Sequence, residues 1–105
     1  MIFDLRIYTL RPGMLSTWLK MYEQYGHPTQ VQYCGEPVIY TTTEVGALNQ
    51  VVHVWRYDSQ ADREQKRDAL MRDPVFQEYL RRSAEMGAHA NQENRILKSV
   101  SFAPR

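Results

Sequence analysis

Four ionisable side chains in two segments of the chain could do chemistry together. Asp4, Arg6 and Tyr8 occupy every second position near the start, and His53 lies in a second strand-like segment. A histidine, a carboxylate, an arginine and a phenol that converge in a partly enclosed space form a reasonable general-base and anion-binding set. We therefore predict a catalytic group in which His53 accepts a proton, Arg6 holds a developing enolate or carboxylate, and Asp4 is the third member.

The same residues also have a structural interpretation. Subunit interfaces collect polar networks, in which Asp4 would pair with Arg6 and His53 would bond to a neighbouring group. Because interfaces gather the same residue types, we place this interpretation ahead of the catalytic one.

Aromatic side chains near these residues are candidates for ligand contacts. Tyr8, Trp55 and Tyr57 could form the walls of an apolar pocket. They could equally form the core of a dimer interface, which is the commoner position for such residues. Tyr40 is a further candidate, although the face on which it lies depends on the register of its strand.

The sequence gives no support for a metal or cofactor site. His27, His53 and His89 are far apart and have no metal-ligand spacing around them, and Cys34 is the only cysteine. Neither the dinucleotide fingerprint nor the P-loop pattern occurs. Nothing supports haem ligation by a single histidine. We therefore expect no metal and no cofactor.

The composition is that of an ordinary globular domain. The 105 residues are 43% apolar and 24% charged, with a formal net charge of +1, so we expect one domain over residues 1–105. The net charge is too small to predict a nucleic-acid partner. The lone cysteine, the charges near the first residue and the absence of any run of about 20 apolar residues predict a cytoplasmic protein with no membrane partner.

Periodicity predicts four strands, at residues 2–9, 38–43, 50–57 and 94–102. Two helical regions lie between them. The first runs from Pro12 to about residue 26 and is followed by a short helical turn over 29–36. The second begins with a capping box at Ser59, restarts at Asp73-Pro74 and ends at Gly87.

This order of elements predicts an α+β, ferredoxin-like βαββαβ fold, a four-stranded antiparallel sheet with its helices on one face. We expect Phe3, Leu5 and Ile7 to face the helices. The other face would then carry the polar and aromatic candidates, Asp4, Arg6, Tyr8, His53, Trp55 and Tyr57. Because a monomer would expose large aromatic side chains there, we expect a second subunit or a ligand to cover that face.

Several stretches of the chain resemble the NIPSNAP family. The most recognisable is Leu-Asn-Gln-Val-Val-His-Val-Trp at residues 48–55, together with Tyr57. Further matches are Leu-Arg-Ile-Tyr-Thr-Leu at 5–10 with the Pro-Gly that follows, Thr-Thr-Glu-Val-Gly at 42–46, and Gln-Glu-Asn-Arg-Ile-Leu at 92–97. One departure is Asp4, where the family more often has glutamate. The carboxylate is kept there on a shorter side chain.

The resemblance implies a dimeric α/β barrel, in which two ferredoxin-like sheets face each other and enclose a space. Related barrel families include cofactor-free monooxygenases, haem-binding enzymes and small-ligand binders, but the family itself has no settled activity. We therefore expect a homodimeric barrel that binds a small, partly apolar molecule, with cofactor-independent chemistry as its most specific form. The alternative is a non-catalytic interaction module whose polar sheet face only stabilises the dimer.

Overall fold

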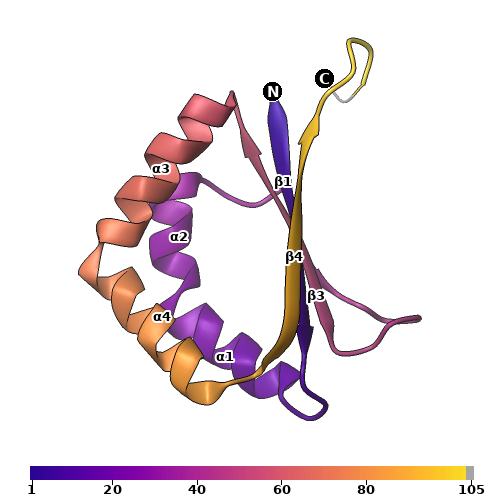
Figure 1. Cartoon of the computed structure of the whole chain (residues 1–105), viewed down its shortest axis with the longest axis vertical. Coiled ribbons are helices and arrows are strands. Elements are labelled where there is room, and N and C mark those ends of the chain that lie inside the picture. Colours follow the sequence, from indigo (N-terminus) through magenta and orange to yellow (C-terminus); the bar gives the residue numbers. More distant parts are fainter. Residues whose placement is uncertain (104–105) are drawn as a thin grey trace.

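The computed structural model describes residues 1–103; Pro104 and Arg105, at the end of the expected domain, lie outside the described residues. The elements follow in the order β1 (Ile2–Leu10), α1 (Leu15–Tyr25), α2 (His27–Cys34), β2 (Ile39–Thr42), β3 (Gln50–Tyr57), α3 (Gln60–Arg72), α4 (Pro74–Met86) and β4 (His89–Lys98). The strands form one antiparallel sheet in the order β2-β3-β1-β4, and the helices cover one of its faces (Figure 1). The predicted ferredoxin-like α+β fold is confirmed. The sheet of the single chain is open, with β2 and β4 at its edges.

Capping residues set the ends of the later helices as predicted. The side chain of Ser59 accepts a 3.0 Å hydrogen bond from the backbone N–H of Asp62 at the start of α3. Asp73 accepts one of 2.8 Å from the backbone N–H two residues further on, and Pro74 occupies the first turn of α4, where an N–H would have no helical partner. Gly87 ends α4 in the left-handed conformation, with a φ of 61°.

The last strand differs most from its predicted bounds. β4 covers His89–Lys98 rather than 94–102, because its first residues pair with Thr9 and Leu10 at the end of β1. Those residues have weak intrinsic strand propensity, so pairing with β1 decides their conformation. The helical turn expected over 29–36 is a helix of 8 residues, α2.

The structure reverses the predicted orientation of the sheet. The grouping of the polar and aromatic candidates on one face is confirmed by the register of β1 and β3, in which Asp4 lies opposite Trp55 and Arg6 opposite His53. That face packs against the helices, because Trp55 is buried in the core and Asp4 bonds to Arg63 of α3.

The expectation that Phe3, Leu5 and Ile7 face the helices is therefore wrong. The physical reason is the size of the side chains on the two faces of β3. Trp55 and Tyr57 bury more apolar area against the helices than Val52 and Val54 could, and a large ring contributes more free energy when removed from water.

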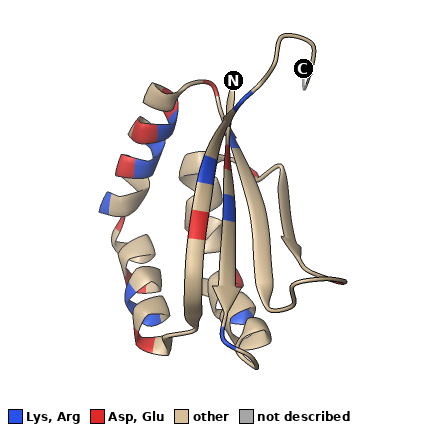
Figure 2. Cartoon of the chain, turned by 45° about the vertical axis from the view of Figure 1, so that its right-hand side comes forward, with Lys and Arg blue, Asp and Glu red and all other residues tan. Residues whose placement is uncertain are grey.

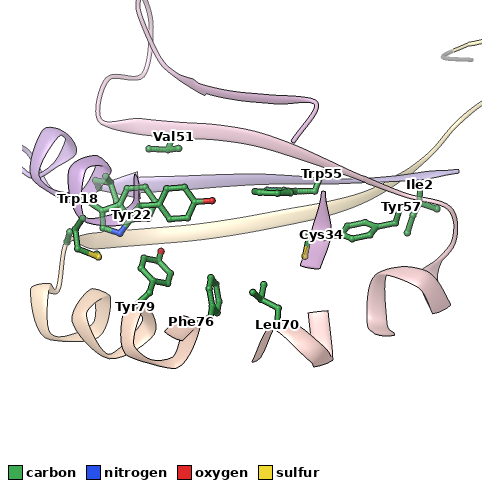
Figure 3. Packing of buried hydrophobic residues seen from close by; sticks show 13 residues of the cluster. Ile2, Trp18, Tyr22, Cys34, Val51, Trp55, Tyr57, Leu70, Phe76 and Tyr79 are labelled. Atoms are coloured by element: carbon green, nitrogen blue, oxygen red, sulfur yellow. The ribbon is translucent and has the colours of Figure 1, made fainter. Parts of the chain in front are cut away.

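The core lies between the sheet and the helices. Trp55 and Tyr57 of β3 lie opposite Leu70, Phe76 and Tyr79 of α3 and α4, as Figure 3 shows. At one end, the rings of Trp18 and Tyr22 from α1 stack with their centroids 5.3 Å apart. This core holds the helices beside the residues that the sequence analysis singled out.

Charged residues are most frequent on the helices α3 and α4. Figure 2 shows Lys, Arg, Asp and Glu along α3 and α4, and further charged residues on β1 and β4. Among the described residues, no helix is long and apolar enough to cross a bilayer.

Candidate functional site

A cavity of about 380 Å³ lies between the sheet and the helices of the single chain. We call it the central cavity. Its sheet side is formed by Arg6, Tyr8, Tyr40, His53, His89 and Gln92, and its helix side includes Tyr22, Gln30, Arg67, Met71, Phe76, Tyr79, Leu80 and Ser83. The volume falls within the range of about 300–1,000 Å³ that is usual for small-molecule sites.

The mouth of the central cavity lies between β4 and the helices α3 and α4. Met71, Leu80 and Gln92 line the cavity and are exposed to solvent, whereas His53 on its inner wall is 1% exposed. A ligand could therefore enter without passing through the core.

Four of the predicted site residues meet in this cavity. Arg6, Tyr8, Tyr40 and His53 all line it, although the sequence placed them in a space between two sheets. That placement is wrong, because the cavity lies within one chain. Tyr40, which the sequence could not orient, shares the helix-facing side of the sheet and lies opposite His53 in the β2–β3 ladder.

The other three predicted residues lie outside the cavity wall. Trp55 and Tyr57 belong to the core, so a ligand in the cavity does not contact them directly. Asp4 is fully buried as an acceptor beside the cavity. Each of the three can support the site only through a neighbour.

The carboxylate of Asp4 is held by three donors. Arg6 Nη1 donates to Oδ2 at 3.2 Å, Arg63 Nε to the same oxygen at 3.0 Å, and Asn94 Nδ2 to Oδ1 at 3.3 Å. Burial by itself would raise the pKa of Asp4, but the two guanidinium groups and the hydrogen bonds hold it below its usual value. Asp4 is therefore an anion at neutral pH, and it fixes Arg6 in place.

His53 is held by its neighbour Trp55. The indole Nε1 donates to Nδ1 of His53 at 2.7 Å, inside the protein. Burial lowers the pKa of His53 to about 3, and the charge of Arg6 adds to the effect. The ring is therefore neutral at physiological pH. Because an indole nitrogen can only donate, the proton of the neutral imidazole lies on Nε2.

The Nε2 atom of His53 is buried and has no hydrogen-bond partner among the described residues. With Nδ1 turned to Trp55, Nε2 is the nitrogen left for the cavity. An N–H group buried without a partner costs about 1–3 kcal/mol, so such an atom calls for a ligand or an ordered water. The geometry favours a hydrogen-bond donor over the general base that the sequence suggested.

Tyrosine rings form much of the cavity wall. Tyr22 and Tyr40 stack with centroids 5.1 Å apart, and Tyr40 lies 4.4 Å from the His53 ring. Burial raises the pKa of Tyr22, Tyr40 and Tyr79. These phenols therefore stay protonated and offer hydroxyl groups and apolar ring faces to a ligand.

Beside the central cavity, a second groove of about 510 Å³ is lined mainly by residues of α1 and β2. Tyr22 and Tyr40 line both spaces, so their stacked rings form the partition between them.

The helices contribute half of the site, which could not be predicted from the sequence. Arg67 of α3, Gln30 of α2 and Ser83 of α4 line the cavity, as does His89 of β4. Arg67 lies in a run of mixed charges typical of a solvated helix face, and nothing in its spacing shows that one arginine points inward. Among the described residues, no group of three metal-binding side chains is close enough to hold an ion.

The opposite face of the sheet has an apolar middle that is uncovered in the single chain. It carries alternate residues of the four strands: Phe3, Leu5, Ile7, Ile39, Val52, Val54 and Leu97. We call this the open sheet face. Ile39 is 44% exposed and Leu97 43% exposed. Glu93 and Arg95 of β4 share this face, opposite Ile7 and Leu5, so neither joins the network around Asp4.

Comparison with known proteins finds a match to the NIPSNAP family model over residues 3–104. The human NipSnap homolog 3A is 34% identical over 77 residues, which cover 72% of this chain and 30% of the human protein. A NIPSNAP family protein from Agrobacterium tumefaciens is 34% identical, with a TM-score of 0.89 over 98% of this chain and 96% of that one. An uncharacterized NIPSNAP-like domain protein from Burkholderia xenovorans is 36% identical, with a TM-score of 0.89 over 99% of this chain and 89% of that one.

The chain spans about a third of the length of the curated relatives that it matches. A putative antibiotic biosynthesis monooxygenase from Nitrosomonas europaea has a TM-score of 0.68 over 95% of this chain and 99% of that one, at 8% identity. That likeness shows a shared fold alone.

Proposed function

The chain belongs to the NIPSNAP family, and we propose that it binds a small, partly apolar molecule in the central cavity as one subunit of a homodimer. The observation that carries the proposal is the buried Nε2–H of His53, which has no partner among the described residues. A cavity of this size beside an unpaired donor, with tyrosine rings for walls, has the features of a ligand site.

The open sheet face supports the homodimer. Soluble monomers rarely leave large contiguous apolar patches in water. Phe3, Leu5 and Ile7 run through the middle of this face, between Val52 and Val54 on one side and Leu97 on the other. A second copy that packs its own open sheet face there would cover both patches.

The non-catalytic interaction module is the alternative function, and the same open face favours it. From the sequence, His53 and Asp4 were expected to stabilise the dimer. Both side chains lie on the helix side of the sheet, with 1% and 0% exposure in the single chain. In this alternative the apolar residues of the open sheet face would stabilise the dimer, and the central cavity would hold only water.

Cofactor-independent chemistry is a narrower form of the proposal. Hydrogen-bond donors on the cavity wall, such as Arg6 and His53, would stabilise the enolate oxygen of a bound ligand as it forms. The base would then be His89 rather than His53, because His89 lines the cavity and Nδ1 of His53 is occupied by Trp55. Burial lowers the pKa of His89, which keeps it neutral and able to accept a proton. His89→Gln would abolish turnover and leave ligand binding measurable.

A fragment screen followed by NMR of the labelled protein tests the proposed binding. Fragments should shift the signals of Tyr8, Tyr40 and His53, and Tyr40→Phe should weaken binding several-fold. Thr41→Val is the matched control, because it removes one hydroxyl from the neighbouring residue on the other face of β2. Fragments that shift only residues outside the cavity, or bind equally to both variants and the parent protein, would contradict the proposal.

A further inference from the structure

We propose that the ligand of the central cavity is a planar oxyanion on an apolar body, of the aromatic carboxylate class, and that His53 donates its Nε2–H to that oxyanion. This inference rests on the proposed function and names the chemical class of its ligand.

The charges of the cavity wall favour a negatively charged ligand. Arg6 and Arg67 line the cavity, and none of the described residues that line it is an aspartate or a glutamate. The nearby carboxylate of Asp4 is shared between Arg6 and Arg63, so one negative charge faces three guanidinium groups in this region. Arg67 takes part in no described ion pair and is close enough to help lower the pKa of His53. An anion would balance this excess, whereas a cation would meet repulsion.

Arg6 has a hydrogen-bond donor left for a ligand. Arg6 uses Nε for Tyr8 at 3.2 Å and Nη1 for Asp4 at 3.2 Å, which leaves Nη2 without a described partner. Because Asp4 and Tyr8 fix the plane of the guanidinium, Nη2 is already oriented before a ligand arrives. A charged guanidinium donor such as Nη2 makes a strong hydrogen bond to a carboxylate oxygen.

The hydrogen bond from Trp55 makes His53 a donor toward the ligand. It occupies Nδ1 of His53, so the neutral ring presents Nε2–H as a donor. A carboxylate or enolate oxygen accepts such a bond, whereas an ammonium group cannot. Trp55 is therefore a positioning residue, which acts on the ligand only through the tautomer of His53.

The apolar walls of the cavity favour a flat aromatic or conjugated body. Tyr22 and Tyr79 lie edge to face with centroids 5.5 Å apart, and Phe76 packs against Tyr79 at 5.1 Å. All three line the cavity. Their rings suit a flat aromatic or conjugated body behind the acidic group. The positive groups and the aromatic wall together select a molecule with one charged end.

Calorimetric titration of the full chain with 2-naphthoate and with 2-naphthamide tests the inference. The two probes have nearly the same size and shape, but only the first carries a charge. We expect 2-naphthoate to bind at least tenfold more tightly than 2-naphthamide. NMR of the 2-naphthoate complex should also show a shifted Nε2–H resonance of His53. Arg67→Gln should weaken 2-naphthoate several-fold and leave 2-naphthamide unchanged.

Arg72→Gln is the matched control. It removes the same charge from the same helix at an exposed position that does not line the cavity. Equal affinities for the two probes, or equal effects of the two arginine substitutions, would overturn the anion selectivity and leave the proposed binding intact. Binding of neither probe would also overturn the inference, and the fragment screen would then decide separately whether the cavity binds any molecule.

Discussion

The indole nitrogen of Trp55 donates a 2.7 Å hydrogen bond to Nδ1 of His53, two residues away on the same face of β3. This contact decides which nitrogen of His53 carries the proton and which one faces the central cavity. The sequence suggested that His53 is a base, and the contact favours a donor.

The first prediction concerns the tautomer of His53. Long-range proton–nitrogen NMR of the parent protein should show a neutral ring with its proton on Nε2. Trp55→Phe removes the donor to Nδ1, so the variant should show a mixture of both tautomers and a loss of about 1–3 kcal/mol in stability. A parent protein with the proton on Nδ1 would contradict the assignment.

The second prediction concerns pH. The pKa of His53 is about 3 in the folded chain and 6.5 as an ordinary histidine. Above pH 6.5 neither state binds the proton, so His53 adds no pH dependence. As the pH falls from 6.5 towards 3, the unfolded chain binds one more proton, and the free energy of unfolding should fall by about 1.4 kcal/mol per pH unit.

Urea denaturation between pH 7.5 and 4.5 measures this slope. His53→Gln should flatten it by about one proton. His89 contributes in the same direction, because burial lowers its pKa as well. Asp4 contributes only at lower pH, where its carboxylate takes up a proton in the unfolded chain before it does so in the folded chain. A slope that His53→Gln leaves unchanged would show that His53 titrates normally in the folded protein.

The third prediction concerns assembly. Leu5→Glu places a carboxylate on the open sheet face, directly opposite Arg95 of β4, which gives the new charge a partner in the folded monomer. Sedimentation should show dimers of the parent protein and monomers of this variant. Val45→Arg is the control, because Val45 is 91% exposed in the loop between β2 and β3. A parent protein that sediments as a monomer would refute the proposed dimer.

The fourth prediction concerns Gly26, between α1 and α2. A Cβ there would lie 2.8 Å from a ring carbon of Tyr22 and 2.9 Å from one of Tyr79. Gly26→Ala should therefore displace both rings, lower stability by about 1–3 kcal/mol and shift their NMR signals.

Gly13→Ala provides the comparison for Gly26→Ala. Gly13 has a φ of 86° and no atom within 4 Å of an added Cβ. Its substitution should cost about 1–2 kcal/mol through the backbone alone, with no change at the tyrosines. Unchanged tyrosine signals in Gly26→Ala would mean that the junction can yield without disturbing the cavity wall.

Local features of the fold could be predicted from the sequence. Ser59, Asp73 and Gly87 set helix ends through bonds to residues only a few positions away, and such bonds follow from residue type and spacing. The alternation of β1 likewise showed that Asp4, Arg6 and Tyr8 share a face.

Which face packs against the helices could not be decided in the same way. Both faces carry apolar residues, and a carboxylate such as that of Asp4 is usually exposed to solvent. Its burial depends on Arg63, 59 positions away on α3, and such a partner is visible only once the chain has folded. The better signal was the size of Trp55, since a face with a large ring gains most from burial.

The helix-borne part of the candidate site was beyond the sequence for a related reason. Arg67 lies in a run of mixed charges that suits a solvated helix. Its position on the cavity wall follows from how α3 packs over the sheet. The electropositive character of the cavity therefore emerged only from the structure.

The most direct test of the account is a crystal structure of the protein purified without added ligand, with attention to the cavity beside His53. We expect non-protein density within hydrogen-bond distance of Nε2 and close to Arg6. A structure in which Nε2 bonds to a protein side chain and the tyrosine rings fill the cavity would contradict the proposed ligand site.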